Sequence, residues 1–457
     1  MKPIAAAQLA HMAKGTWYGP PRPVMVSSIT IDSRIAKAGS LFVALSGETQ
    51  DGHDHVIDAF HAGASCALID AKHAHRIKVA MGDLNRSLIV VDDPLRALQK
   101  MAQVHVAAHT QVQRVGVSGS CGKTTTKEMI ASVLSTMGKT AKTPGNFNSE
   151  IGLPISVFEI EEDTAFGVFE MGVDHVGEMD RMLEIWKPQA AVITNIGISH
   201  IGKMGSVQVI AKEKSKLFHP DIQSPFLAEH SAWMRYIEKF RKVTPLPFGR
   251  LSTEGIQHIE SLGLEGYRIL YCNTPIHLRA VGNHNLMNAL AAISVAQSFG
   301  ARPEEIAEGF ERFVSAPGRS RVIEGPVTVI ADYYNSSVDS TATILDYMGS
   351  LPCTGRKRAV LGSMKELGSV TEAAHQLVAR KLIASKIDDM YLYGKEMESA
   401  WLECRRLGID RSVFYTDDYE ALQRRMIEDT KKGDLVLIKG SRSMTMERLV
   451  PAITSIA

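Results

Sequence analysis

The sequence contains few cysteines, and their positions do not suggest a disulfide framework or a metal site. The chain has 457 residues and five cysteines, at positions 66, 121, 272, 353 and 404. An odd number of scattered cysteines argues against an obligatory set of disulfides, and their spacing is not that of metal ligands. We therefore expect a protein of a reduced compartment, which places it in the cytoplasm.

Long apolar runs and an excess of charge of either sign are also missing. No run is long enough to cross a membrane, and the N-terminal apolar stretch soon meets His11 and Lys14, so it lacks a signal-peptide core. The 51 basic and 50 acidic residues leave a net charge of +1. That balance gives no general attraction to nucleic acid or to an anionic membrane, so any anion binding must be local. We expect no nucleic-acid partner, no membrane insertion and a monomer.

The rest of the composition is that of an ordinary globular protein. Hydrophobic residues make up 45% of the chain and charged residues 22%. We find no fixed-period repeat and no low-complexity tract. A chain of this length is expected to form about three domains, each with its own core.

Apolar segments that alternate with helical segments predict an α/β protein with parallel sheets. We expect domains at residues 1–108, 109–316 and 317–457, with a linker at 316–319. The strands that we expect are residues 26–31, 39–45, 67–70, 88–91, 115–117, 167–170, 190–195, 327–331, 358–361, 390–393 and 435–438. The helices that we expect include residues 56–61, 94–108, a segment from 123 onward and 285–299.

A phosphate-binding loop, Ser118–Thr124, is the most informative motif. It follows the apolar strand 115–117 and opens a helix, an order that places backbone N–H groups and a helix N-terminus around an anion. Its two glycines let the backbone approach phosphates, and Lys123 and the Thr124 hydroxyl are where such loops hold phosphate and Mg²⁺. The strict pattern would require glycine at Val117, so the shorter Ser-Gly-x-x-Gly-Lys-Thr is the motif present. The loop predicts a nucleotide site that uses ATP.

Polar residues at strand ends are candidate metal ligands. Glu170 ends an apolar strand, and a carboxylate at the rim of a phosphate site suits Mg²⁺, although an isolated glutamate would more simply cap the next turn. His200 follows another strand end, where a lone histidine is more often structural than a ligand. The charged run 210–218 would by default be a solvated helix face. A lysine of that run turned toward metal and phosphates would need a modification or a close anion.

Two asparagines and an arginine are further candidates for the nucleotide site. Asn285 and Asn288 lie at i,i+3 on one helix face, where their amides can read a base edge or a phosphate. The alternative is that Asn283 or Asn285 caps the helix. Arg319 follows the linker and could reach back as a charge-stabilising arginine when the third domain closes.

Together these residues resemble the Mur ligases, the ATP-dependent amide-bond-forming enzymes of peptidoglycan precursor synthesis, along nearly the whole chain. The features shared with several members are 32–34, 39–44, 51–53, 118–124, Glu170, His200, Lys214 and 282–288. The chain is most similar to the members that add D-alanyl-D-alanine to a UDP-N-acetylmuramoyl-tripeptide. That match rests on 143–148, 151–154, Tyr334-Asn335, 360–368 and 439–447. The Asn-Pro-Arg motif of diaminopimelate- or lysine-adding members is absent.

The resemblance implies a UDP-binding first domain, a central ATPase domain and a Rossmann-like third domain for the amine donor. It implies amide-bond formation through an acyl phosphate, with ATP and Mg²⁺ as cofactors and the UDP-tripeptide and D-Ala-D-Ala as small-molecule partners. It also implies that Lys214 is N-carbamylated, so that the added carboxylate becomes a ligand of Mg²⁺ beside Glu170 or His200.

The same resemblance, joined to the motifs above, assigns residues to each role. Catalytic roles fall to Lys123, His200 and Lys214, and metal ligation to Thr124, Glu170, His200 and Lys214. The expected ATP site contains Ser118, Gly119, Ser120, Cys121, Gly122, Lys123, Thr124, Thr125, Asn285, Asn288, Arg319 and Asp332. The expected UDP-substrate site contains Ser33, Arg34, Asp51, Gly52, His53, Asn146 and Asn148. The expected amine-donor site contains Asn335, Asp339, Lys439, Ser441 and Arg442.

The chain departs from the family pattern in three places. The usual Asp-Asp-x-Tyr-Asn-Ala-Asn-Pro is Ala-Asp-Tyr-Tyr-Asn-Ser-Ser-Val at 331–338, the usual Gly-Asp-Met is Gly-Ser-Met at 362–364, and Cys121 replaces a small polar residue. The first two changes bear on the amine donor and on domain closure, so the donor's identity stays open, and we expect the ATP chemistry to be kept.

Three other functions compete with this prediction. They are a Mur-type ligase with a different amine or depsipeptide donor, a non-catalytic paralogue that binds its ligands as a sensor or scaffold, and a generic P-loop kinase or NTPase. Retention of the whole metal set disfavours the second, and Val117 with the motif at 439–447 disfavours the third. The sequence does not identify the base that takes the proton of the amine; His200, His284 and Asn335 are expected neighbours of the reacting groups.

Overall fold

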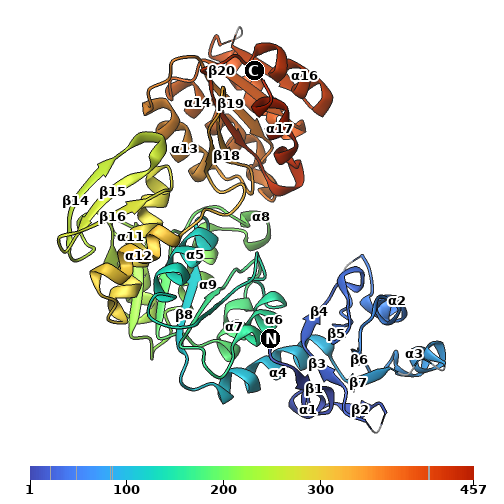
Figure 1. Ribbon diagram of the computed structural model, residues 1–457. Coiled ribbons are helices and arrows are strands. Elements are labelled where there is room, and N and C mark those ends of the chain that lie inside the picture. The colour runs from blue at the N-terminus through green and yellow to red at the C-terminus, as the bar shows by residue number, and fades with distance from the viewer. Residues whose placement is uncertain (21, 48, 83, 85, 410–411, 457) are drawn as a thin grey trace. The chain divides into compact units, whose positions relative to one another are not determined.

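The computed structural model describes residues 1–457 except 21, 48, 83, 85, 410–411 and 457 (Figure 1). The chain divides into two compact units. The first contains residues 1–116, 138–173 and 177–189, and the second contains 117–137, 174–176 and 190–457. Both units combine helices with largely parallel sheets, so the predicted α/β class is confirmed.

The N-terminal part of the first unit is built around a five-stranded sheet of order β2-β7-β6-β5-β4. Strands β4 to β7 run parallel, and β2 pairs antiparallel with β7. Figure 1 shows α2 and α3 beside this sheet, and Phe42, Phe60 and Ile69 lie in its core. The elements are α1 (Ala6–Met12), β2 (Thr16–Tyr18), β4 (Ser28–Thr30), β5 (Ser40–Val43), α2 (Val56–Ala62), β6 (Cys66–Asp70), α3 (Ala74–Met81), β7 (Ser87–Val91) and α4 (Pro94–Ala108).

One expected strand, 26–31, is wrong as a single element. Strand β3 (Met25–Val26) pairs antiparallel with β1 (Ile4–Ala5), whereas β4 starts at Ser28 and joins the larger sheet. The break falls at Ser27, whose N–H donates to the carbonyl of Gly39 at 2.8 Å. A run of residues with high strand propensity does not reveal that its two halves pair with different partners.

The central sheet has six strands in the order β13-β12-β11-β8-β10-β9. In the first unit β9 and β10 pair in parallel, and in the second unit β11, β12 and β13 do. Strand β8 crosses from one unit to the other and ends at the expected phosphate loop. The strands are β8 (Gln113–Ser118), β9 (Thr140–Lys142), β10 (Phe166–Glu170), β11 (Ala190–Ile193), β12 (Ser224–Ala228) and β13 (Leu246–Phe248). The helices are α5 (Lys123–Leu134), α6 (Gly152–Ser156), α7 (Glu178–Ile185), α8 (Ile201–Met204), α9 (Val207–Ser215), α10 (Met234–Arg241), α11 (Asn283–Ser298) and α12 (Pro303–Arg312).

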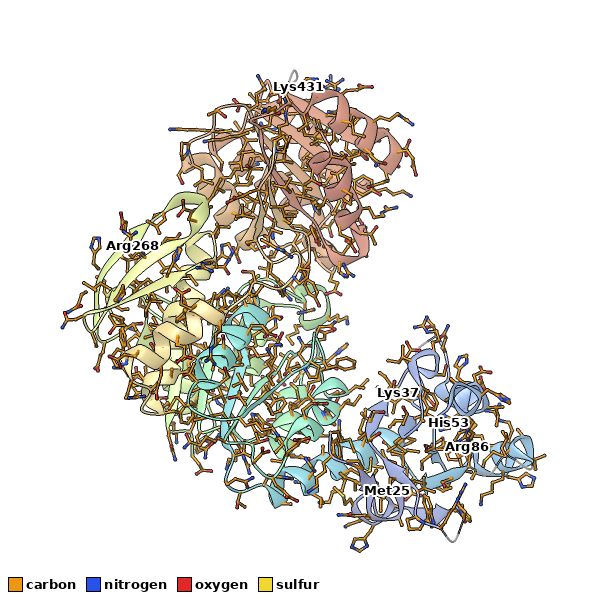
Figure 2. All side chains as sticks on the ribbon, viewed as in Figure 1. Met25, Lys37, His53, Arg86, Arg268 and Lys431 are labelled. Carbon is orange, nitrogen blue, oxygen red and sulfur yellow. The ribbon has the colours of Figure 1, made fainter. Side chains whose placement is uncertain are left out.

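An antiparallel three-stranded sheet in the second unit was not among the predicted elements. It consists of β14 (Ile256–Ser261), β15 (Tyr267–Tyr271) and β16 (Thr274–Leu278). Residues of β15 alternate between buried and exposed, and Arg268 on its outer face pairs with Glu260 of β14 at 2.8 Å (Figure 2). This period-two alternation was the available sequence signal.

The C-terminal sheet has the order β17-β18-β22-β19-β20-β21, in which the edge strand β17 is antiparallel and the others are parallel. Alternate residues of β22 enter two cores, with Leu437 on one face and Val436 on the other. Burial on both faces explains its unbroken apolar run. The strands are β17 (Arg321–Ile323), β18 (Thr328–Asp332), β19 (Lys357–Gly362), β20 (Asp389–Tyr393), β21 (Val413–Thr416) and β22 (Leu435–Lys439). The helices are α13 (Val338–Ser350), α14 (Thr371–Ala384), α15 (Glu398–Arg406), α16 (Tyr419–Asp429) and α17 (Leu449–Thr454).

Short polar side chains begin several of these helices. Asp93 caps α4 ahead of Pro94, Ser206 caps α9 and Ser337 caps α13, each by accepting a hydrogen bond from a backbone N–H of the first turn. Within the described part of the chain, no helix is both long and apolar enough to span a membrane. All five cysteines are free.

Candidate active site

The phosphate loop (residues 118–124) requires glycine at two positions for a steric reason. The backbone of Gly119 has a φ of +142°, and a Cβ there would lie 2.0 Å from the hydroxyl oxygen of Thr194. Gly122 has a φ of +82°, and its Cβ would lie 2.7 Å from Oδ1 of Asn288. Among the described residues no side chain caps α5 at Gly122. The helix N-terminus can therefore offer its N–H groups to an anion.

The end of β11 holds this loop in place. The amides of Ser120 and Cys121 both donate to Oδ1 of Asn195, at 3.1 and 2.9 Å. The hydroxyl of Thr194 donates to the carbonyl of Cys121, and the N–H of Gly197 donates to the Ser120 hydroxyl at 2.9 Å. Sequence analysis identified Asn195 only as a strand end, so this anchoring role was missed.

Two cations lie at the loop. Nζ of Lys123 donates to the carbonyl of Gly119 at 2.7 Å, so the lysine curls back over the loop. Arg319 donates from Nη2 to the hydroxyl of Thr124 at 2.9 Å, and its guanidinium stacks on the ring of Tyr334 at 3.8 Å. The structure therefore brings together three residues that the sequence placed in the ATP site, one of them about 200 positions away in the chain.

The two asparagines of α11 are buried beside the loop. Nδ2 of Asn285 donates to the carbonyl of Val281 at 2.8 Å, and Nδ2 of Asn288 donates to Oδ1 of Asn285 at 3.2 Å. The helix begins at Asn283 after Gly282, without a side-chain cap among the described residues. The alternative that Asn283 or Asn285 caps this helix is therefore wrong.

His200 lies among charged side chains after β11. Its backbone is left-handed, with a φ of +62°, and its Nδ1 lies 3.0 Å from Oδ1 of Asp174 and 2.9 Å from Oε2 of Glu366. Burial lowers the pKa of His200, as do the cations Lys123 and Lys214, and this outweighs the two carboxylates. The imidazole is consequently neutral near pH 7, the form in which histidine binds metals. Neither carboxylate was predicted from the sequence.

Glu170 and Lys214 are both buried, each 1% exposed. In the first unit Oε1 of Glu170 accepts a hydrogen bond from Nδ2 of Asn148 at 2.6 Å. Asn148, expected at the UDP substrate, therefore holds a carboxylate expected to bind metal. In the second unit Lys214 lies on α9 next to Glu213, which is also buried, while Lys212 is exposed. The default of a solvated helix face is wrong for this charged run, because two of its charges point inward.

The predicted UDP-binding residues of the first unit include an exposed arginine. Arg34 forms a two-point contact with Asp32, from Nε to Oδ1 at 2.8 Å and from Nη2 to Oδ2 at 2.7 Å. Hydrogen bonding from Arg34 lowers the pKa of Asp32 to about 2. Ser33 is half-buried and Asn146 is exposed. Asp32 also caps the short helical turn that contains Arg34, so the arginine is held against its own turn while its side chain stays exposed.

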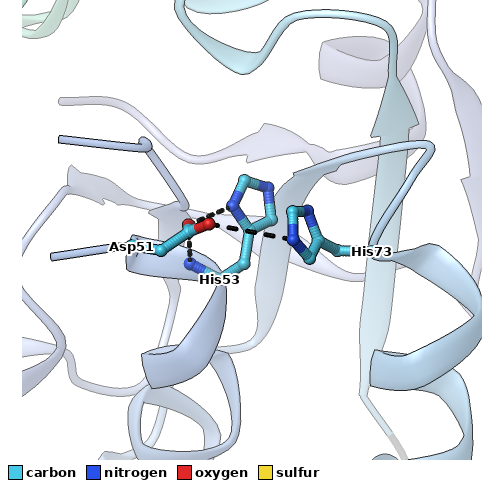
Figure 3. Close-up of side chains that lie close together, drawn as sticks. All are labelled: Asp51, His53 and His73. Carbon is cyan, nitrogen blue, oxygen red and sulfur yellow. Dashed lines mark hydrogen bonds and ion pairs between the residues drawn. The ribbon is translucent and has the colours of Figure 1, made fainter. Parts of the chain in front are cut away.

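His53 lies in a cluster with His73, Asp51 and Asp70 in the same unit, and Figure 3 shows Asp51, His53 and His73. Nε2 of His53 accepts from the N–H of Asp70 at 3.1 Å, so Nδ1 carries the proton that is shared with Asp51 at 2.6 Å. His73 stacks on His53 with ring centroids 4.2 Å apart and lies 2.7 Å from Asp70. Asp51, His53 and His73 are close enough to suggest a metal site. Because both nitrogens of His53 are already engaged, the cluster acts as an internal brace for the loop that contains Gly52.

The predicted donor-binding residues gather at the carboxyl ends of the C-terminal strands. Nζ of Lys439 donates to Oδ2 of Asp332 at 2.6 Å and to the carbonyl of Asn335 at 3.0 Å. Lys439 was expected at the amine-donor site and Asp332 at the ATP site, so this ion pair connects residues of two expected sites. The Ser441 hydroxyl accepts from the N–H of Lys365 at 3.0 Å.

Two predicted residues differ in how close they lie to the phosphate loop. Arg442 pairs with Glu447 at 2.7 Å on the surface. Asp339 lies next to Gly197, where a Cβ would be 2.6 Å from its Oδ2. Sγ of Cys121, one of the departures from the family pattern, lies 3.1 Å from the hydroxyl of Ser337, which caps α13 and belongs to the altered stretch 331–338.

Comparison with known families assigns a class to this arrangement. The Mur ligase middle domain matches residues 117–296, the glutamate ligase domain of the Mur ligases matches 318–442, and the Mur ligase family catalytic domain matches 25–105. The chain belongs to the Mur ligase family.

Individual relatives match end to end. The UDP-N-acetylmuramoyl-tripeptide–D-alanyl-D-alanine ligase of Treponema pallidum is 36% identical over 93% of this chain and 93% of its own length. The enzyme of the same name from Bacillus subtilis is 34% identical over 97% and 96%. Among solved structures, MurF from Acinetobacter baumannii superposes with a TM-score of 0.86 at 26% identity over 99% of both chains. MurF ligase from Thermotoga maritima in complex with ADP gives 0.76 at 25% identity over 93% and 97%.

Proposed function

We propose that this chain is the ligase that joins D-alanyl-D-alanine to a UDP-N-acetylmuramoyl-tripeptide, with ATP, in peptidoglycan precursor synthesis. The observation that carries this conclusion is the end-to-end match to ligases of that name, at 36% and 34% identity. The phosphate loop agrees with it, because Lys123 and Thr124 stand at an uncapped helix N-terminus and Arg319 reaches the same point. We also propose that the protein is a cytoplasmic monomer. Its five cysteines are free thiols, which agrees with a reduced compartment.

The first chemical problem is the repulsion between two anions. A carboxylate must approach the terminal phosphate of ATP before it can be activated as an acyl phosphate. Lys123, Arg319 and the N–H groups at the start of α5 offset that repulsion and stabilise charge on the transferring phosphoryl group. Asn195 holds two loop amides in fixed positions, so the loop needs little rearrangement to receive a phosphate.

Two of the residues proposed for Mg²⁺ offer the oxygen donors that this ion prefers: Glu170 is a buried carboxylate, and the Thr124 hydroxyl lies in the first turn of α5. His200, the third, offers an imidazole nitrogen. A carbamate on the buried Lys214 would add a further oxygen ligand, shielded from bulk water. When bound, Mg²⁺ neutralises phosphate charge.

The second chemical problem is the protonated amine of the dipeptide. An α-amino group has a pKa of about 8 and must lose a proton before it attacks. Of the candidate bases, His284 is poorly suited, because burial lowers its pKa to about 4. Burial lowers the pKa of His200 as well, while the carboxylates of Asp174 and Glu366 beside its Nδ1 act in the opposite direction.

The test is an amine panel with purified protein. Phosphate release is measured with ATP, Mg²⁺ and UDP-N-acetylmuramoyl-tripeptide, and with D-Ala-D-Ala, D-alanyl-D-lactate, D-alanine or L-Ala-L-Ala in turn. We expect release that depends on D-Ala-D-Ala and falls at least about 100-fold in Lys123→Ala, with an unchanged melting temperature. Phosphate release with D-alanyl-D-lactate and with none of the other donors would show that the donor is the depsipeptide. No release with any amine would overturn the proposal.

A further inference from the structure

Ser320 is a serine in a strained and enclosed position. It follows Arg319 and precedes β17, and it is 3% exposed. Its backbone is left-handed, with a φ of +54°. Residues other than glycine adopt this conformation only where the surrounding structure holds them there. The contacts of Ser320 therefore identify what holds it.

Three elements of the second unit converge on this serine. Oδ1 of Asp332, at the end of β18, accepts from both the N–H and the hydroxyl of Ser320, at 3.0 and 3.1 Å. Nε2 of His284, on α11, lies 3.0 Å from the same hydroxyl. Lys439, at the end of β22, donates to the other oxygen of Asp332 at 2.6 Å.

The direction of each hydrogen bond follows from the chemistry of the groups. Asp332, ion-paired with the buried Lys439, only accepts, so the Ser320 hydroxyl donates to it. The same hydroxyl oxygen then accepts the proton on Nε2 of His284. Nδ1 of His284 is left as the unprotonated nitrogen, without a partner among the described residues. This neutral ring agrees with the pKa of His284, which burial lowers to about 4.

The turn that precedes Ser320 fixes the backbone from which the side chain of Arg319 extends. The turn before it is closed by the N–H of Arg319, which donates to the carbonyl of Ala316 at 3.2 Å. Gly318 packs against Tyr333, which a Cβ would approach to 2.7 Å. From this fixed turn the guanidinium of Arg319 reaches Thr124 at 2.9 Å.

We propose that Ser320 is a positioning residue, which His284 and the Asp332–Lys439 pair hold so that Arg319 meets the phosphate loop at Thr124. The proposal rests on the ATP-dependent ligation proposed above. An arginine that is oriented before ATP arrives loses less conformational freedom on binding, so its contact with phosphate is stronger. Ser320 is not among the residues expected to touch a substrate, and its effect on ATP passes through the orientation of Arg319.

The test distinguishes the effect of losing the Ser320 hydroxyl from the effect of the strained backbone and from a general loss of stability. Ser320→Ala removes the hydroxyl and keeps the strain, whereas Ser320→Gly removes both. Steady-state KM values for ATP, the UDP-tripeptide and D-Ala-D-Ala are measured for each, with melting temperatures. Ser350→Ala, whose hydroxyl donates to the carbonyl of Tyr347 within its own helix, is the control. We expect Ser320→Ala to raise the KM for ATP about tenfold, with the other two KM values within about twofold of the wild type.

A double variant shows whether the effect passes through Arg319. Ser320→Ala combined with Arg319→Ala should be no worse than Arg319→Ala alone, because the serine has nothing left to position. Independent, additive losses would overturn the proposal, as would an unchanged KM for ATP or an equal rise in all three KM values. If the alanine variant does not fold, the same cycle is run with Ser320→Gly. A wild-type protein without ligation activity would instead defeat the proposed function.

Discussion

At the residue scale, the phosphate loop depends on positions where no side chain is present. A Cβ at Gly119, Gly122 or Gly197 would come within 2.0, 2.7 and 2.6 Å of Thr194, Asn288 and Asp339. At Gly119 and Gly122 the close approach brings a polar group from another segment against the loop, and at Gly197 it brings Asp339 against the segment that bonds to Ser120. The glycines therefore serve the packing of the loop as well as its access to phosphate.

The proposed carbamate on Lys214 gives a test at a single side chain. Lys214→Ala removes the amine that would carry the carbamate, and we expect activity to fall at least about 100-fold. Added formate or acetate should restore part of it, because a small carboxylate can occupy the space and replace the missing anion. Phosphate release with and without the added acid is the measurement. Lys212→Ala, an exposed neighbour on the same helix, should change little and show no rescue. The assignment would be wrong if no carboxylate rescued Lys214→Ala at any concentration.

The stability of the C-terminal sheet at low pH depends on the carboxylate of Asp434. It accepts from the N–H groups of Arg356 and Lys431, both at 2.8 Å, and from Nε of Arg358 at 2.7 Å. Burial by itself raises the pKa of Asp434, but these hydrogen bonds outweigh it and lower the pKa below its ordinary value. Its contribution to stability is therefore complete above the unfolded pKa of about 4 and is lost as pH falls through the lower folded value.

We predict that Asp434→Asn lowers the free energy of unfolding by about 3 kcal/mol at pH 7, because it breaks a buried pair with Arg358. The difference from the wild type should narrow as the pH falls below about 4, where the Asp434 carboxyl of the unfolded chain takes up a proton, and further as the pH falls through the lower pKa of the folded protein. Urea unfolding at a series of pH values measures both effects. Asp417→Asn, at an exposed aspartate, should show neither. A difference that stayed constant with pH would contradict the assignment to this charge.

At the element scale, the phosphate loop runs into α5, and α12 packs closely against this helix. A Cβ on Gly309 of α12 would lie 2.4 Å from the Cα of Val133 on α5. The Ser132 hydroxyl donates to the carbonyl of Gly309 at 2.7 Å. The contact is thus between two backbones, which cannot move apart as a flexible side chain could.

We predict that Gly309→Ala destabilises the protein by about 2 kcal/mol, although alanine favours helices, because the added carbon overpacks this contact. It should also raise the KM for ATP, since α5 carries the loop. The measurements are urea unfolding and phosphate release. Gly325→Ala is the matched control, because a Cβ there meets only the carbonyl of Val327 at 3.5 Å. Equal stability of the two variants would contradict the proposed packing role.

Most elements could be predicted from apolar runs, and the exceptions have physical causes. Strands β18, β19, β20 and β22 lie within two residues of their predicted bounds, because burial on both faces leaves a continuous apolar signal. The sheet of β14 to β16 was missed because its strands are half exposed and mix polar with apolar residues. The segment 26–31 was predicted as one strand because propensity does not specify a strand's partner.

At the scale of the whole molecule, the first unit carries Arg34 and the second carries the phosphate loop. We predict that Arg34→Ala raises the KM for the UDP-tripeptide about tenfold and leaves the KM for ATP unchanged, because a single charged contact with one substrate is lost. Asp32 would lose its ion-pair partner, but Arg34 is exposed and Asp32 only half-buried, so the melting temperature should stay within about 1 °C. Lys37→Ala, an exposed lysine of the same unit, is the control. Weaker ATP binding in Arg34→Ala would contradict the role given to the first unit.

The candidate site was predictable where its residues form a continuous motif. The spacing of residues 118–124 alone predicts a phosphate loop. Glu170 ends a strand and His200 follows another strand. Asn195, Asp174, Glu366 and Ser320 were not predicted, because each is defined by a partner far away in the chain. The pairing of Asp332 with Lys439, neighbours in register across β18 and β22, is of the same kind.

The amino-acid sequence by itself determined the class of the protein, the position of its phosphate loop and most of the strands that lead to it. These follow from local causes: glycine conformation, helix starts and the burial of apolar runs. The tertiary structure decided which polar groups surround the loop and what holds them, from the amides on Asn195 to the chain of hydrogen bonds behind Arg319. Hydrogen bonds and ion pairs act over a few ångströms, so only the fold can bring such distant residues within range of one another.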